Sequence, residues 1–348
     1  MPDRRAARGA GARGPGARSP RRGGGTARGG RDGSGRSASG IGAVMSGQDS
    51  ITRCANAKVN LALAVAPPRE SDGLHPICSW FVSIDLCDKV TIERLAAGSE
   101  RRVRIEWAED ALRPSPIDWP VGKDLAARAL DLLEREAGRA LPAALHVRKR
   151  IPVGAGLGGG SSDAAAALIA GRELFGLEID DDRLRALGAE LGADVPFFLP
   201  PQPGGAALVE GIGEKIERSA PARATLALVA PPYGCNTGAV YRGFDEAIPD
   251  RFRERDVRDM ARSGRVESGR LFNDLAAPAE RAAPKLAELR RALRELTGAS
   301  FHITGSGSGV FAVIEEADDE AQAAHMIEAI GKAAPDHGVV VTRVVGEG

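Results

Sequence analysis

The chain has 348 residues, of which 43% are hydrophobic, and its 47 lysines and arginines balance 47 aspartates and glutamates. This length predicts a folded protein with two domains, because a single hydrophobic core rarely grows beyond about 250 to 300 residues. No apolar stretch reaches the roughly 20 residues that a membrane-spanning helix needs, and none near Met1 resembles a secretory signal. We therefore expect a cytoplasmic protein with no membrane partner.

The first 44 residues differ in composition from the rest of the chain. They hold ten arginines and two aspartates, and almost no side chain large enough to bury. Such a segment cannot recover the entropy lost on ordering, so we expect a disordered Arg/Gly-rich extension over 1–44. Two interpretations stay open: a basic arm that binds nucleic acid, or an extension without a function, with Met45 as the true start.

Alternating apolar and polar residues predict several strands in the part of the chain that follows. In the stretch 80–95 this alternation continues on both sides of Cys87, Asp88 and Lys89, which predicts a β-hairpin turning at these three residues. Helices are predicted where apolar residues recur at helical spacing. The other predicted strands are 57–65, 101–107 and 144–152, and the predicted helices are 122–138, 161–176 and 181–192.

The pattern changes at about residue 219. The order of elements from there is β-α-β-β-α-β with extra helices inserted, which is typical of ferredoxin-like domains. The sequence therefore predicts one domain over 45–218 and a second over 219–348. The elements of the second are strands at 225–232, 301–304, 310–316 and 339–345, and helices at 284–298 and 319–334.

No residue pattern typical of a zinc site is present. The cysteines Cys54, Cys78, Cys87 and Cys235 form no C-x-x-C pair, and the five histidines are not spaced as partners for them. Four thiols in a chain of this size suit a reducing compartment. We therefore expect no structural zinc.

Residues 151–168, IPVGAGLGGGSSDAAAAL, contain the spacing G-x-G-x-x-G between a predicted strand and a predicted helix. A dinucleotide-binding fingerprint needs a second strand that ends in an acid about 20 residues further on. No strand fits between Gly176 and Asp180, where the next helix begins. The P-loop fingerprint fails as well, because Gly160 is followed directly by two serines and not by the lysine that this fingerprint requires.

This glycine-rich loop still has what a polyphosphate needs. Five glycines between 154 and 160 let backbone N–H groups approach phosphate oxygens, and a helix N-terminus follows. A flexible linker fits poorly, because a capped helix begins within the glycine run. The loop therefore predicts binding of a nucleotide's phosphates.

The glycine-rich loop resembles the central phosphate-binding motif of the GHMP kinases. The segments AKVNLAL (57–63), GADVPFFL (192–199) and TGSGSGVFAV (304–313) are similar to further motifs of the same family. The segment SDGLHPICSWF (71–81) resembles the cytidine-facing segment of one branch, which phosphorylates the 2-hydroxyl of 4-diphosphocytidyl-2-C-methyl-D-erythritol in the non-mevalonate isoprenoid pathway. The resemblance covers residues 54 to about 345.

The resemblance implies an α+β fold, the two-domain GHMP kinase fold, with a ribosomal protein S5 domain 2-like N-terminal domain and a ferredoxin-like C-terminal domain. It implies an ATP-dependent kinase whose substrate is a small cytidyl alcohol. ATP would bind at Pro152, Val153, Gly154, Ala155, Gly156, Leu157, Gly158, Gly159, Gly160, Ser161 and Ser162. The two serines would contact phosphate or Mg²⁺, which the chemistry requires although no carboxylate cluster identifies its ligands.

Two residues are implied as catalytic. Lys58 stands in an otherwise apolar strand, where a lysine is costly to bury without a partner. By resemblance it lies beside Asp194, which would accept the proton of the attacking hydroxyl. The Lys58 charge would stabilise negative charge on that oxygen.

The implied substrate-binding residues are Asn60, His75 and Tyr241. Two positions depart from the branch that the sequence resembles. Leu74 stands where an aromatic residue usually stacks on cytosine, and Asp124 stands where an asparagine usually contacts adenine. Two interpretations of Tyr241 stay open: it supplies the missing ring from the other domain, or it is a partly buried core residue.

Two other functions remain open. One is a GHMP kinase that acts on a different alcohol, such as homoserine, mevalonate or a sugar. The other is a nucleic-acid-binding module, against which the acidic body of the chain and the presence of Lys58 and Asp194 argue. We expect no nucleic-acid partner except through the basic extension, and either a monomer or a homodimer.

Overall fold

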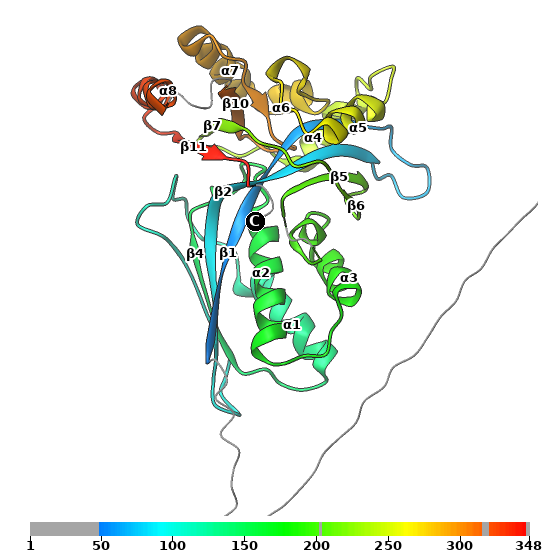
Figure 1. Ribbon diagram of the computed structural model, residues 1–348, viewed down its shortest axis with the longest axis vertical. Coiled ribbons are helices and arrows are strands. Elements are labelled where there is room, and N and C mark those ends of the chain that lie inside the picture. The colour runs from blue at the N-terminus through cyan, green and yellow to red at the C-terminus, as the bar shows by residue number, and fades with distance from the viewer. Residues whose placement is uncertain (1–48, 202–203, 315–319, 346–348) are drawn as a thin grey trace, which may run out of the picture. The chain divides into compact units, whose positions relative to one another are not determined.

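The structure, a computed structural model, describes residues 49–201, 204–314 and 320–345 (Figure 1). The expected extension 1–44 and the alternative start at Met45 lie outside these ranges. Within the described ranges, none of the helices is both long and apolar enough to span a lipid bilayer.

The first sheet is built around two long antiparallel strands. β1 (Ser50–Val65) pairs with β2 (Ile77–Arg94) along almost their whole length. The strand order is β3-β4-β2-β1-β8, and β5 pairs with β2 and β6. The other strands are β3 (Arg102–Trp107), β4 (Ala143–Lys149), β5 (Ala206–Gly211), β6 (Lys215–Arg218) and β8 (Phe272–Asn273).

Three helices pack beside this sheet: α1 (Leu125–Ala137), α2 (Gly159–Leu174) and α3 (Asp181–Leu191) (Figure 1). Helix α2 contacts both central strands and α1. It can approach them closely because half of its buried residues are alanines and another is Gly171, where a Cβ would lie 2.5 Å from Leu133 of α1. This close packing fixes the start of α2, where the glycine-rich loop ends.

The predicted hairpin at Cys87, Asp88 and Lys89 is wrong. Strand β2 runs through these residues without a turn, and Ala55 of β1 stands opposite Asp88. Asp88 is fully buried, where it binds Lys149 of β4. The polar residue at that position is thus an inward-facing side chain of a continuous strand rather than a turn residue.

The second sheet has the order β11-β7-β10-β9, with all neighbours antiparallel. Counted along the chain, the fourth strand lies beside the first, then the third and the second, as in a ferredoxin-like sheet. The strands are β7 (Thr225–Ala230), β9 (His302–Ile303), β10 (Val310–Ile314) and β11 (Gly338–Arg343). The helices of this part are α4 (Thr237–Asp245), α5 (Glu254–Ser263), α6 (Ala276–Ala282), α7 (Pro284–Thr297) and α8 (Glu320–Ala333).

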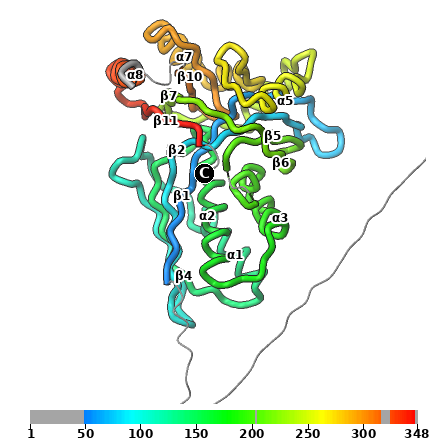
Figure 2. Tube along the Cα trace, viewed as in Figure 1, coloured from blue at the N-terminus to red at the C-terminus, as the bar shows by residue number. Residues whose placement is uncertain are grey.

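Segments from the two halves of the chain meet at several places. Strand β8 pairs in parallel with β1 of the first sheet. The end of β11 reaches β2, where Val344 forms a bridge with Ile84 (Figure 2). Segments from the second half of the chain therefore contact both central strands of the first sheet, β1 and β2.

Candidate active site

The glycine-rich loop joins β4 to α2 and adopts a conformation that glycine favours. Gly156 and Gly158 have φ of 77° and 70°, in the left-handed region. The backbone N–H of Lys58 donates to the carbonyl of Leu157 over 2.9 Å, which ties the loop to β1. A Cβ on Gly158 would lie 3.0 Å from Cγ of Lys58. The loop therefore passes directly over the Lys58 side chain.

A second glycine-rich turn, residues 304–309, packs against the first. The N–H of Gly309 donates to the carbonyl of Ala155 over 3.0 Å. A Cβ on Gly156 would lie 2.5 Å from the carbonyl oxygen of Thr304, and one on Gly307 would lie 2.3 Å from the nitrogen of Gly156. The two turns can meet only because these positions lack side chains.

We expect Gly307→Ala to lower the free energy of unfolding by about 1–3 kcal/mol, because a methyl group would force the two backbones apart. Urea denaturation measures this change. The matched control is Gly331→Ala in α8, where a Cβ would meet nothing within 4 Å and alanine is the better helix former. Equal stability of the two variants would contradict the close approach.

The structure brings Lys58 and Asp194 together from distant parts of the chain. Lys58 comes from β1, and Asp194 directly precedes the short 3₁₀ helix Val195–Phe198 without capping it through its side chain. The ammonium nitrogen lies 3.6 Å from Oδ2 of Asp194. The lysine side chain is 5% exposed and that of the aspartate 33%, so the carboxylate lies at the open side of the pair. A reactant can reach Asp194 while the ammonium stays beneath it.

Asn60 holds the Lys58 ammonium in place. Nζ of Lys58 donates to Oδ1 of Asn60 over 2.6 Å, and Nδ2 of Asn60 donates to Oγ of Ser79 over 3.0 Å. The N–H of Asn60 donates to Oγ1 of Thr304 over 3.0 Å. Asn60 is thus buried, and its polar groups bond to Lys58, Ser79 and Thr304.

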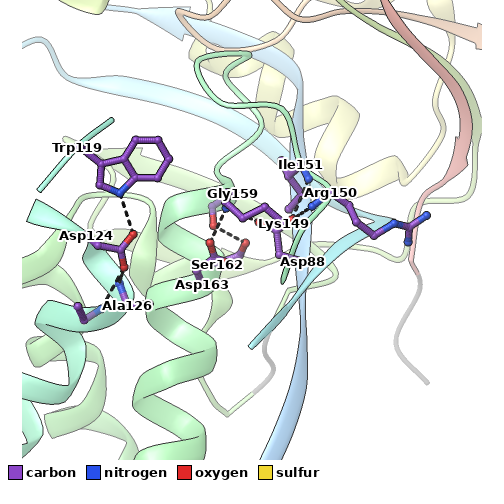
Figure 3. A network of polar contacts seen from close by, with 11 residues as sticks. Asp88, Trp119, Asp124, Ala126, Lys149, Arg150, Ile151, Gly159, Ser162 and Asp163 are labelled. Atoms are coloured by element: carbon purple, nitrogen blue, oxygen red, sulfur yellow. Dashed lines mark hydrogen bonds and ion pairs between the residues drawn. The ribbon is translucent and has the colours of Figure 1, made fainter. Parts of the chain in front are cut away.

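A buried cluster of three charged residues lies beneath the glycine-rich loop (Figure 3). Nζ of Lys149 lies 2.5 Å from Oδ2 of Asp88 and 2.6 Å from Oδ2 of Asp163. Oδ1 of Asp88 accepts the N–H groups of Arg150 and Ile151, at 2.5 and 2.8 Å. This charged cluster therefore fixes the point where β4 turns into the loop.

The charged cluster holds two acids and one base, so its charge is unbalanced. Burial raises the pKa of Asp163 to about 8, although the Lys149 charge opposes the shift. Burial alone would lower the pKa of Lys149, but the charges of Asp163 and Asp88 outweigh it and raise that pKa. Oδ1 of Asp163 has no hydrogen-bond partner among the described residues. A proton on Asp163 relieves the surplus negative charge.

Our sequence analysis missed this cluster, although the sequence carries a signal for it. Leu145, Val147 and Lys149 alternate along β4, so the lysine occupies an inward position of that strand. Asp88 occupies the same kind of position between Leu86 and Val90 in β2. Charged residues at inward positions on two strands predict a buried ion pair.

A cleft of about 350 Å³ opens between the glycine-rich loop and residues 119–125. Of the eleven loop residues expected to bind ATP, all except Ala155 and Ser162 line this cleft. Ser162 is buried, and its hydroxyl donates to the carbonyl of Gly159 over 3.0 Å. Ser161 faces the cleft. The two expected hydroxyls thus lie in different environments, and only that of Ser161 is open to a ligand.

His75 and Tyr241 lie side by side, and neither of them lines the cleft. Nε2 of His75 lies 2.8 Å from Oδ1 of Asp245, and the His75 ring centre lies 5.0 Å from that of Tyr241. Burial, followed by the charge of Asp194, raises the pKa of Tyr241 to about 12. Because of this raised pKa, the phenol of Tyr241 stays neutral near Asp194. Leu74, by contrast, is 46% exposed.

Asp124 is fully engaged within the protein. Its Oδ1 accepts the N–H groups of Ala126 and Ala127, which caps α1, and its Oδ2 accepts Nε1–H of Trp119 over 3.1 Å. In the part of the chain that the structure describes, no group of three or more His, Cys, Asp or Glu side chains is arranged to hold a metal ion.

Comparison with known proteins agrees with this geometry. The family model described as the GHMP kinases N terminal domain matches residues 124–200, and the GHMP kinases C terminal model matches 252–334. The 4-diphosphocytidyl-2-C-methyl-D-erythritol kinase of Pelotomaculum thermopropionicum is 35% identical over 283 residues, which cover 79% of this chain and 92% of the relative. The kinase of the same name from Thermus thermophilus is 36% identical over 284 residues, covering 81% of this chain and 94% of that one.

Solved structures give the same result. A crystal structure of 4-(cytidine 5'-diphospho)-2C-methyl-D-erythritol kinase matches with a TM-score of 0.67 and 32% identity, and the match covers 85% of this chain and 100% of that one. The mevalonate kinase of L. major matches with a TM-score of 0.60 at 16% identity, covering 86% and 98%, which shows the shared fold. The predicted two-domain α+β fold is confirmed. The chain belongs to the GHMP kinases, a family of ATP-dependent small-molecule kinases.

Proposed function

We propose that this chain transfers the γ-phosphoryl group of ATP to the 2-hydroxyl of 4-diphosphocytidyl-2-C-methyl-D-erythritol. The observation that carries the proposal is the Lys58–Asp194 pair, 3.6 Å apart, directly beside the glycine-rich loop. Relatives of that name, which align over more than nine-tenths of their own length, support the choice of substrate.

The phosphates of ATP bind along the loop residues that line the cleft. Backbone N–H groups at the start of α2 donate to phosphate oxygens, and the positive end of the helix dipole favours their charge. The neighbouring turn, residues 304–309, holds the loop in place through backbone contacts with Ala155 and Gly156. This support keeps the N–H groups oriented before the nucleotide arrives.

The acceptor hydroxyl binds between the terminal phosphate and the Lys58–Asp194 pair. As its oxygen forms a bond to the γ-phosphorus, the bond from that phosphorus to the β–γ bridging oxygen breaks and ADP leaves. The hydroxyl proton passes to the Asp194 carboxylate. The Lys58 ammonium, held by Asn60, stabilises the negative charge on the attacking oxygen.

Mg²⁺ fits this site through the Ser161 hydroxyl, which faces the cleft and has no hydrogen-bond partner among the described residues. Mg²⁺ commonly takes few protein ligands and is held largely by substrate phosphates and water. When bound, it neutralises charge on the β- and γ-phosphate oxygens.

His75, Tyr241 and Asp245 form the proposed subsite for the cytosine. Asp245 holds one ring nitrogen of His75, which leaves the other free to hydrogen-bond a base. Tyr241 supplies an aromatic surface in place of the ring that Leu74 lacks. The exposure of Leu74 gives a specific reason to test other alcohols, because the base loses one stacking partner there.

A substrate panel tests the proposed function. ADP release is measured with 4-diphosphocytidyl-2-C-methyl-D-erythritol, homoserine, mevalonate and sugars, and the product on the preferred alcohol is identified by ³¹P spectroscopy. We expect turnover on the cytidyl alcohol and none above background on the others. Turnover confined to an alcohol without a cytidyl group would contradict the proposed substrate while leaving the kinase chemistry in place.

A further inference from the structure

The end of the cleft opposite the glycine-rich loop is formed by residues 119–125. Of the described residues that line the cleft, Trp119 alone is aromatic. Its indole is half-buried and borders the same cavity as Leu125 at the start of α1 and Gly160 at the start of α2. A flat apolar surface therefore lies in the cleft that the nucleotide's phosphates would enter.

Asp124 fixes the orientation of this indole. One of its carboxylate oxygens caps α1, and the other accepts the indole N–H. An ionised carboxylate can do both, because each of its oxygens is an acceptor. An asparagine at this position would present an NH₂ group to the indole N–H, and two donors cannot pair. The aspartate at position 124 and the tryptophan at position 119 thus form one unit (Figure 3).

We propose that Trp119 is the surface on which the base of the bound nucleotide stacks, and that Asp124 is the positioning residue for it. The inference rests on the proposed use of ATP and adds the part of the site that holds its base. Every base has an aromatic face, so stacking on an indole needs no specific hydrogen-bond partner. The Asp124 side chain is committed to the protein, so the base is held chiefly by its face.

The geometry of the cleft separates the two ends of the nucleotide. The phosphates need the N–H groups at the start of α2, which places them along residues 154–160. The base then extends toward residues 119–125, where the indole lies (Figure 3). Loss of one stacked aromatic partner lowers affinity by about 5- to 150-fold.

Calorimetric titration of the full chain with two probes tests the inference. The first probe is a non-hydrolysable ATP analogue, and the second is inorganic tripolyphosphate, which has no base. We expect Trp119→Leu to weaken the analogue by about 5- to 150-fold and to leave tripolyphosphate unchanged. Trp119→Phe keeps an aromatic face and should bind the analogue nearly as the wild type does.

Trp107→Leu is the matched control. Trp107 ends β3 and does not line the cleft, and its indole N–H donates to the Ser115 carbonyl over 2.6 Å. We expect this variant to bind both probes as the wild type does. Equal weakening of both probes by Trp119→Leu, or equal effects of the Trp107 and Trp119 variants, would mean that the indole only supports the fold, and would overturn the inference.

Fluorescence provides a measurement that does not need the leucine variant to fold. Saturating nucleotide should quench part of the tryptophan emission of the wild type, and this quench should vanish in Trp119→Phe although the analogue still binds. Persistence of the full quench in Trp119→Phe would overturn the inference.

Asp124→Ser tests the positioning role. Serine is a good helix cap but is too short to reach the indole as well. We expect weaker analogue binding with unchanged tripolyphosphate binding and a preserved unfolding midpoint. Analogue binding by Asp124→Ser equal to that of the wild type would remove Asp124 from this role.

Inactivity of the wild type on the cytidyl alcohol would contradict the proposed function alone, whereas unchanged analogue binding by Trp119→Leu would contradict only the role of Trp119.

Discussion

Replacing Asp194 with asparagine is expected to lower kcat by about 100- to 10,000-fold, because the amide cannot accept the hydroxyl proton during phosphoryl transfer. Nucleotide affinity should stay close to that of the wild type, since the glycine-rich loop contacts Lys58 and Asp194 does not line the cleft. Steady-state kinetics with the cytidyl alcohol gives kcat, and calorimetry with a non-hydrolysable ATP analogue gives affinity.

The control for this variant is Asp182→Asn on α3, whose side chain is 91% exposed and lies outside the cleft. It should leave both kcat and affinity unchanged. Near-normal turnover of Asp194→Asn would remove Asp194 as the proton acceptor. A joint loss of turnover and nucleotide affinity would instead indicate that the carboxylate organises the glycine-rich loop.

Replacing Lys149 with methionine is expected to lower the free energy of unfolding by about 3–5 kcal/mol at pH 7.5, because the buried Asp88 carboxylate loses the ammonium that pairs with it, and the Asp163 carboxyl group loses the same partner. Urea denaturation measures the change. The control is Lys332→Met, which breaks an exposed pair with Glu328 on α8 and should change stability little. Similar small effects in both variants would show that the buried cluster does not depend on its ammonium.

Asp163→Asn examines the same cluster by removing its surplus acid. Burial raises the pKa of Asp163 to about 8 in the folded protein, well above the ordinary value of 3.8 for an aspartate in an unfolded chain. Between these values the folded protein holds a proton that the unfolded chain has lost, so stability falls as pH rises from about 4 to about 8. The variant lacks this dependence, and its stability relative to the wild type should increase across the same interval. A constant difference over that interval would place the proton elsewhere.

Local patterns predicted most of the elements but not the partners of buried polar residues. The alternation on both sides of Cys87, Asp88 and Lys89 predicts two strands in 80–95, where the structure has one continuous strand. The partner of Asp88, Lys149, lies some sixty residues further along, and one sequence gives no distance between them. Burial beside a cation makes an aspartate compatible with the middle of a strand, whereas local propensity favours a turn.

The same limit applied to the site. The glycine spacing and the helix start indicated a phosphate-binding loop, and the resemblance indicated that Lys58 and Asp194 meet. The different environments of Ser161 and Ser162 follow from the helical turn of α2, which directs one hydroxyl into the cleft and the other onto the Gly159 carbonyl. The role of Trp119 depends on which acceptor its N–H finds, and that acceptor, Asp124, was interpreted from the sequence only as a departure from a family pattern.

The contact between residues 304–309 and the glycine-rich loop has a consequence for biosynthesis. Most of the chain must leave the ribosome before the Gly309 N–H can reach the Ala155 carbonyl. Contacts between segments so far apart in sequence form late, because a long loop must first close. We therefore expect nascent chains that end before this turn to retain no ATP, so the nucleotide stabilises the finished enzyme rather than guiding its early folding.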